Sequence, residues 1–227
     1  MKKILSLLAL CLTLITVKAA VDPTANGTIL VCSGGTITVP NAPVGTAYEI
    51  AYSASQTTTP NDGITTASVG ATNTSFAEKG TGYYYFATKN TTTGCISEWQ
   101  EIPVYVLKPL IATIDAANNS LCIEDLGGTK ALLTGNITNP EASTTGISLA
   151  YQWYTVASGT ETAISGATNS TYTIPAPLSA GTYTYKLKVG YLINSGKYCS
   201  TTADKAIEIL AKPTTPTISV SNVPDTW

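Results

Sequence analysis

Histidine and arginine are both missing from this 227-residue chain, and charged residues make up only 11% of it. Without histidine, the Ser-His-Asp and Cys-His catalytic pairs and the commonest metal ligand are excluded. Without arginine, no side chain offers a planar fork that grips phosphate or carboxylate through two hydrogen bonds. The composition therefore argues against an enzyme and against phosphate-centred functions, and we expect no cofactor and no metal.

The first stretch, 1–20, has the pattern of a secretory signal peptide. Lys2 and Lys3 precede an apolar run that ends in two small residues, Ala19 and Ala20. The run is shorter than the roughly 20 apolar residues that span a bilayer, so a transmembrane anchor is the weaker interpretation. We predict cleavage after one of the two alanines, a secreted or cell-surface location, and no membrane insertion after cleavage.

Removal of this stretch leaves nine lysines against 14 carboxylates, a net charge of −5. Such a charge repels nucleic acid and anionic membrane, so neither is expected as a partner. The remaining chain is rich in residues that favour strands and turns, with 37 of the 39 Thr of the full sequence and all of its 13 Tyr and 18 Gly. Its length suits one large β domain or two domains of roughly 100 residues.

An internal repeat decides between one domain and two. The stretch GATNTSF at 70–76 returns as GATNSTY at 166–172, and each is followed by a Gly-rich turn and a Tyr-rich strand. Each copy also begins with a cysteine, passes a second cysteine and ends in Lys-Pro. Repetition at this spacing predicts two copies of one unit, which we place at 21–108 and 109–211.

Alternation of apolar and polar residues predicts antiparallel strands in both copies. In the second copy, Tyr183, Tyr185 and Leu187 share one face of a strand at 182–191, and Tyr183 resembles the tyrosine corner that opens strand F of an immunoglobulin sandwich. Trp153 stands where such a sandwich carries its core tryptophan. Further strands are expected at 36–39, 47–53, 82–90, 102–106, 149–156, 170–175 and 207–209. The sequence thus predicts an all-β protein with two tandem immunoglobulin-like β-sandwich domains after a signal peptide.

Four cysteines remain after the predicted cleavage, and four cysteines allow three pairings. The repeat symmetry selects Cys32 with Cys95 and Cys122 with Cys199, one disulfide inside each sandwich. In both copies the first cysteine precedes strand B and the second lies beyond strand F, so Tyr185 would fill the core volume of the usual central disulfide. Closing loops of this size would stabilise each domain by about 4 kcal/mol.

An aromatic cluster is the candidate for binding. The stretch GYYYF at 82–86 is expected to turn Tyr83 and Tyr85 outward, and Trp99 is grouped with them. Together they are candidate surface contacts of the kind that stack on a carbohydrate. The favoured interpretation is more ordinary, because tyrosines on a sheet surface commonly pack against their cross-strand neighbours.

A pair of acids, Glu124 and Asp125, could bind Ca²⁺ through oxygen ligands together with Asp204. The spaced pattern of Asp and Asn ligands that marks a calcium loop does not surround them. Two solvated acids before a Gly-Gly turn are therefore the favoured interpretation, and no metal site is predicted.

Three segments of the first copy, ILVCSGGTITVP, GYYYFATKNTTTGCIS and IPVYVLKP, are repeated in looser form in the second copy. They resemble the immunoglobulin-like (PKD-like) repeats of secreted and surface proteins of Bacteroidota, over about 27–211. In that family such repeats serve as stalks, spacers or adhesive modules. The resemblance implies a non-enzymatic exported surface protein that acts as a spacer or an adhesion or protein-interaction module, with a protein or glycan at the cell surface as its partner. A carbohydrate-binding module of a secreted glycan-targeting system is the alternative.

The last segment, 212–227, begins like another copy. KPTTPTISVSN at 212–222 aligns with KPLIATIDAAN at 108–118. A lone first strand cannot bury both of its faces. The segment is therefore expected to be either the start of a truncated third repeat or a free tail strand that pairs with a neighbouring sheet edge.

Overall fold

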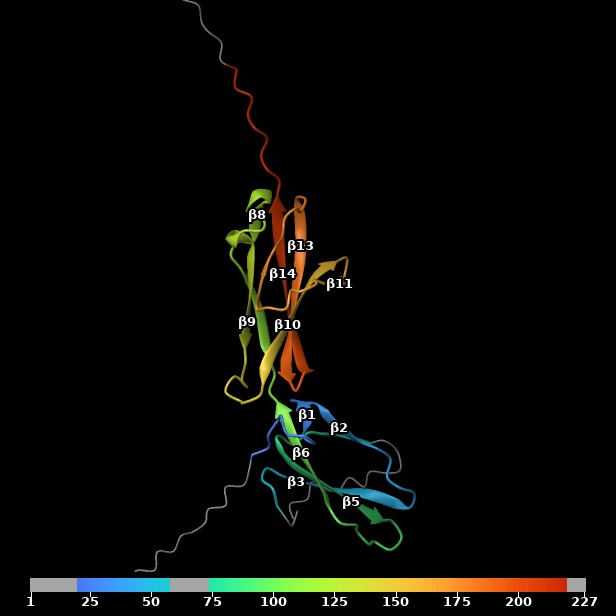
Figure 1. Ribbon diagram of the computed structural model, residues 1–227. Helices are drawn as coiled ribbons and strands as arrows, with labels where there is room; N and C mark the ends of the chain where they lie inside the picture. Colours follow the sequence, from blue (N-terminus) through green and yellow to red (C-terminus); the bar gives the residue numbers. More distant parts are fainter. Residues whose placement is uncertain (1–19, 58–73, 220–227) are drawn as a thin grey trace, which may run out of the picture. The chain divides into compact units, whose positions relative to one another are not determined.

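The computed structural model describes residues 20–57 and 74–219 (Figure 1). Strands dominate these ranges, and the helical content found there is two short 3-10 turns, Ile123–Asp125 and Thr129–Ala131. No helix in the described ranges is long and apolar enough to cross a membrane. The predicted signal peptide lies outside them, apart from its last residue, and residues 211–219 of the tail form no strand.

The chain divides into two compact units, 1–106 and 107–227. This division falls close to the boundary that the sequence repeat predicts, between residues 108 and 109.

Unit 1 contains two sheets. Its four-stranded sheet has the order β1-β6-β5-β3, and its second sheet pairs β2 with β4. The strands are β1 (Ile29–Cys32), β2 (Thr36–Val39), β3 (Thr46–Ser53), β4 (Thr74–Ala77), β5 (Gly82–Asn90) and β6 (Gln100–Leu107). Strands C, F and G (β3, β5 and β6) therefore share one sheet while B and E (β2 and β4) form the other, as in an immunoglobulin sandwich.

Alternate side chains of the two sheets form the core of unit 1. On β5, Tyr84 and Phe86 point inward and are buried together with Ile37 from β2 and Val104 from β6. Tyr84 also makes a tyrosine corner, because its hydroxyl donates to the carbonyl oxygen of Gly80 at 3.1 Å. As predicted from alternation, Tyr84 and Phe86 are the residues of this strand that face the core between the two sheets.

Unit 2 has the same plan with more strands (Figure 1). Its larger sheet has the order β11-β10-β13-β14-β8, and its smaller sheet has the order β12-β9-β7. The strands are β7 (Ile111–Ala116), β8 (Ser120–Cys122), β9 (Leu132–Thr138), β10 (Ser148–Ala157), β11 (Thr160–Ala163), β12 (Thr171–Thr173), β13 (Gly181–Ile193) and β14 (Gly196–Leu210). Strands C, F and G again share one sheet, and B and E share the other.

The core of unit 2 is built around Trp153, which is fully buried and donates its indole N–H to the carbonyl oxygen of Asn169 at 2.9 Å. Tyr185 lies in the same core, as expected for the residue that replaces the central disulfide. Tyr183 makes the predicted corner, with its hydroxyl donating to the carbonyl oxygen of Ser179 at 3.0 Å. The expected all-β immunoglobulin-like fold is confirmed by this strand order and core.

The structure contradicts both predicted disulfide pairings. Cys32 and Cys199 are disulfide-bonded, whereas Cys95 and Cys122 are exposed free thiols. A bond inside each sandwich would require all four to be bonded. The reason for the error lies in where each sandwich places its two cysteines.

In unit 1 the two cysteines lie at opposite ends of β5. Cys32 ends β1 and is followed by a turn in which the Gly34 amide donates to Glu78 Oε1 at 3.1 Å, just before β5 begins. Cys95 lies beyond the other end of the strand, where its carbonyl oxygen accepts from the Asn90 amide at 2.9 Å. The nine residues of β5 span about 26 Å, and a disulfide requires Cα atoms within about 7 Å of each other.

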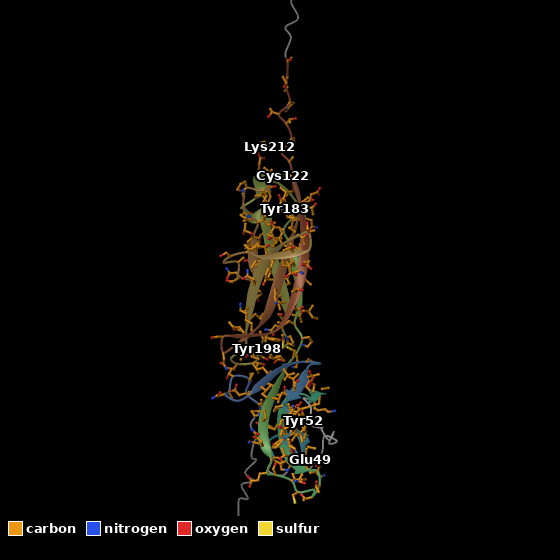
Figure 2. The ribbon with its side chains drawn as sticks, turned by 90° about the vertical axis from the view of Figure 1, so that its right-hand side faces the viewer. Glu49, Tyr52, Cys122, Tyr183, Tyr198 and Lys212 are labelled. Atoms are coloured by element: carbon orange, nitrogen blue, oxygen red, sulfur yellow. The ribbon has the colours of Figure 1, made fainter. Side chains whose placement is uncertain are left out.

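Unit 2 repeats this separation along β14. Cys122 is the register partner of Leu210, the last residue of β14, whereas Cys199 lies near the start of the same strand. The eleven residue steps between positions 199 and 210 correspond to about 36 Å of extended chain. Figure 2 shows Cys122 and Tyr198, the neighbour of Cys199, at opposite ends of the unit. Neither sandwich can therefore bond its own two cysteines.

Candidate functional site

Two loops meet at the end of unit 1 where β5 finishes. They are the connection between strands B and C, around residues 40–45, and the connection between strands F and G, residues 91–99. The amide and hydroxyl of Thr91 both donate to the carbonyl oxygen of Gly45, at 3.0 and 3.1 Å, and tie the loops together. In antibody variable domains the equivalent loops carry binding residues. We call this surface the loop end of unit 1 and define it by Val44, Cys95, Ile96 and Trp99.

Apolar side chains are exposed on this surface. Val44 is fully exposed, Ile96 is 52% exposed and Trp99 is 38% exposed. They make up three of the seven large apolar side chains exposed in the part of the chain that the structure describes. Single exposed apolar residues are ordinary, but several on one pair of tied loops make this end of unit 1 a candidate interaction surface.

Polar residues adjoin the apolar ones. Lys89 is the bridge partner of Ile96, and its ammonium lies 3.1 Å from a carboxylate oxygen of Glu49, the residue labelled in unit 1 in Figure 2. This ion pair is partly exposed and contributes at most about 1 kcal/mol to stability. An apolar centre with a charged but paired border is the usual arrangement of a protein interface.

The structure places the three predicted surface aromatics differently from one another. Trp99 is exposed, but Tyr83 and Tyr85 are buried in a cluster with Val21 and Tyr105. The predicted exposure of the two tyrosines is therefore wrong. Both lie on the outward face of the sheet, as alternation requires, but residues from other parts of the chain cover that face.

Burial has a consequence for the Tyr85 phenol. Desolvation raises the pKa of Tyr85, an effect that the hydrogen bond from the Thr57 amide, 2.8 Å long, partly opposes. Its hydroxyl is thus occupied by the protein itself. Neither Tyr83 nor Tyr85 is available as a stacking platform for a sugar.

A hollow of about 310 Å³ lies on the outward face of β10, β13 and β14 in unit 2. Tyr154 and Tyr198 line it together with Gln152 and Lys188. Gly190 helps keep it open, because a Cβ there would approach the Tyr198 carbonyl oxygen to 3.0 Å. The strand pairing shifts register beside this glycine, between Val189 and Tyr191.

The acids proposed as calcium ligands do not converge. Asp125 lies 2.9 Å from the ammonium of Lys130, Glu124 pairs with Lys212, and Asp204 pairs with Lys186 at 3.5 Å. The hydrogen bond from Lys130 is the largest cause of the lowered pKa of Asp125. Among the described residues, no group of three or more His, Cys, Asp or Glu side chains is arranged to hold a metal ion.

The sequence interpretation missed Val44 and Ile96 at the loop end and Tyr154 and Tyr198 at the hollow. A signal existed for each pair. Val44 and Ile96 are apolar residues inside expected loops, which is a sign of exposed apolar side chains. For Tyr154 and Tyr198 the signal was Gly190, a glycine inside a predicted strand, which indicates a local distortion of the sheet.

No protein-family model and no curated protein sequence matches the chain. Among solved structures it is similar to the N-terminal four Ig domains of Dscam1 isoform 7.44, with 18% identity over 85% of this chain and 46% of that chain and a TM-score of 0.32. It is also similar to three N-terminal domains of the bacteriophage RB49 outer capsid protein Hoc, with 11% identity over 84% and 69% of the two chains and a TM-score of 0.36. For domains A168-A170 of titin the identity is 14%, over 81% and 62%, with a TM-score of 0.35. The chain spans less than half the length of the Dscam1 chain, and its fold assignment rests on the strand order and core described above.

Proposed function

We propose that this chain is an exported, non-enzymatic immunoglobulin-repeat protein that spaces or joins surface components and binds other proteins through the loop end of unit 1. The observation that carries the proposal is the exposure of Val44, Ile96 and Trp99 on two loops that hydrogen bonds tie together. Tied loops bind with a smaller entropy cost than free ones, since less motion is lost on association.

The exposed apolar side chains would contribute favourably to binding if a partner buried them. Complete burial of Val44 or Ile96 in a partner would contribute about 1.5–3 kcal/mol each. Every 1.4 kcal/mol changes a dissociation constant about tenfold. Trp99 adds a ring of the kind that dominates the energetics of interfaces.

Export is supported by two independent features. The first 20 residues have the composition of a signal peptide, and Cys32 and Cys199 are disulfide-bonded, as is usual in oxidising compartments. The absence of histidine from the sequence supports a role without acid-base or nucleophilic catalysis.

The proposal is tested by charge substitution at the loop end. The full exported chain, with Cys95→Ser and Cys122→Ser to remove free thiols, is labelled and its binding to intact cells of the producing organism is measured by flow cytometry. Val44→Asp with Ile96→Asp should reduce the bound amount at least about tenfold, because each aspartate would have to be desolvated in the interface. Ile218→Asp is the matched control, since Ile218 is 80% exposed outside this surface. Equal binding by all three proteins would overturn the proposal.

A second candidate function, carbohydrate binding, is favoured by the hollow in unit 2. Its volume is near the lower end of the range for small-molecule sites. Two tyrosines for stacking and an amide and an ammonium for hydrogen bonds are suited to the hydroxyl-rich surface of a sugar. Trp99 is the other aromatic side chain that this function could use, since Tyr83 and Tyr85 are buried.

A further inference from the structure

The two free thiols, Cys95 and Cys122, occupy different positions within the repeat. Each repeat has a first cysteine before strand B, Cys32 or Cys122, and a second cysteine after strand F, Cys95 or Cys199. One cysteine of each kind, Cys32 and Cys199, is disulfide-bonded. The repeat equivalents of these bonded residues are the cysteines that remain free and exposed.

We propose that Cys122 of one molecule forms a disulfide with Cys95 of a second molecule, so that copies of the chain are joined head to tail. The bond unites a first cysteine with a second cysteine, the two kinds that the structure shows in the bonded state. This inference rests on the proposed function, because it makes a second copy of the chain the partner of the loop end of unit 1.

The surroundings of the two sulfurs suit such a contact. Cys95 precedes exposed Ile96 directly and lies on the surface that carries fully exposed Val44. Cys122 is the register partner of Leu210, whose side chain is 41% exposed. Apolar area is therefore present beside both thiols and would be buried when the two ends meet.

Charge opposes the contact only weakly at the Cys122 end. Figure 2 shows Lys212 near Cys122 at this end of unit 2. Lys212 pairs with Glu124, and Lys130 pairs with Asp125, so two cations and two carboxylates balance one another. Glu208, the register partner of Ser120, adds one carboxylate that forms no salt bridge among the described residues, and its weak repulsion toward a second copy is screened over about 8 Å at physiological salt.

The oxidising equivalents would come from a low-molecular-weight disulfide. The Cys122 thiolate attacks this disulfide, forms a mixed disulfide and releases one thiol. The Cys95 thiolate of the second molecule then attacks the Cys122 sulfur and displaces the second thiol. One disulfide is formed, one is reduced to two thiols, and the two protons of the cysteines are taken up by the released thiolates.

The test uses the full exported chain and oxidised glutathione, followed by non-reducing electrophoresis and mass spectrometry of disulfide-linked peptides. The wild type should form a ladder of dimers, trimers and higher multiples. Cys95→Ser and Cys122→Ser should each remain monomeric when oxidised alone. An equal mixture of the two should form a single dimer linked through Cys122 and Cys95, without higher multiples, because each molecule then carries one reactive thiol.

Three outcomes would overturn the inference: a Cys95→Ser protein that dimerises by itself, a mixture in which both thiols carry only glutathione, or a wild type whose Cys95–Cys122 bond is internal to the monomer. The role of the apolar surface is tested separately in the mixture by adding Val44→Asp and Ile96→Asp to the Cys122→Ser partner. Dimer formation should slow at least tenfold, while Ile218→Asp leaves it unchanged. An unchanged rate with the correct bond would contradict the proposed function and leave the head-to-tail disulfide standing.

Discussion

Tyr185 makes unit 2 sensitive to alkali, and the effect can be isolated with one substitution. The side chain is 2% exposed in the core, with its ring centre 5.8 Å from that of Tyr172. Desolvation, assisted by Tyr172 and Tyr183, raises the pKa of the Tyr185 phenol far above its ordinary value of 10.0. In the unfolded chain the phenol ionises near its ordinary pKa, so above that pH the unfolded state binds fewer protons than the folded state.

The sign and size of the effect follow from proton linkage. Stability from this group is fully present below about pH 10 and is lost as the pH rises toward the folded pKa, by about 1.4 kcal/mol per pH unit. At about pH 11.5 the wild type should therefore have lost roughly 2 kcal/mol that Tyr185→Phe does not lose.

The assay is urea unfolding followed by circular dichroism at about pH 8 and about pH 11.5, with Cys95→Ser and Cys122→Ser in both proteins to prevent disulfide exchange. The other buried tyrosines are common to both proteins, so their contributions cancel in the comparison. At the lower pH we expect a difference of at most about 1 kcal/mol. Parallel losses of stability in the two proteins between these pH values would refute the reasoning.

Two further predictions concern the packing of β9 and the hollow. Gly135→Ala would place a Cβ 2.2 Å from a buried methyl of Leu187, so the free energy of unfolding should fall by about 1–3 kcal/mol in urea titrations. Gly128→Ala, where the nearest atom is 3.4 Å away, should change it by less than about 0.5 kcal/mol, and equal effects of the two substitutions would show that the contact is not tight. If the hollow binds carbohydrate, calorimetric titration of an oligosaccharide panel should show saturable binding that Tyr154→Ala weakens about tenfold, which corresponds to about 1.4 kcal/mol of lost contact energy. Loss through Trp99→Ala instead would place the sugar at the loop end, and flat titrations of the wild type would exclude the function for that panel.

Alternation along a strand determines which side chains face inward, and it could be read from the sequence. It placed Tyr84, Phe86 and Tyr185 in the cores and assigned Trp153 to strand C. These assignments depend only on the period of two residues and on apolar character. They hold even though strand ends differ from the prediction, by one or two residues for the strand predicted at 182–191 and found at Gly181–Ile193, and by eleven residues at the start of the strand predicted at 207–209 and found at Gly196–Leu210.

Burial of the outward face could not be read in the same way. Tyr83 and Tyr85 face away from the core of unit 1, but Val21 packs against them and the Thr57 amide bonds to the Tyr85 hydroxyl. Both covering residues lie far from the tyrosines in sequence. A pattern confined to one strand contains no information about which distant segment covers its outer face. For this reason the sequence could not show that Tyr83 and Tyr85 are buried while Trp99 and the neighbouring loops carry the exposed apolar side chains.

Strand direction alone would have excluded the predicted disulfides. In an immunoglobulin sandwich, strands B and F are separated by four connections, each of which reverses the chain, so both strands run the same way. A cysteine before B and a cysteine after F therefore lie at opposite ends, as Cys122 and Cys199 do. Repeat symmetry identifies which cysteines are equivalent, but equivalence says nothing about the end that each one occupies. A pairing that respects both symmetry and direction joins the first cysteine of one sandwich to the second cysteine of a different sandwich, which is the pattern proposed for Cys122 and Cys95.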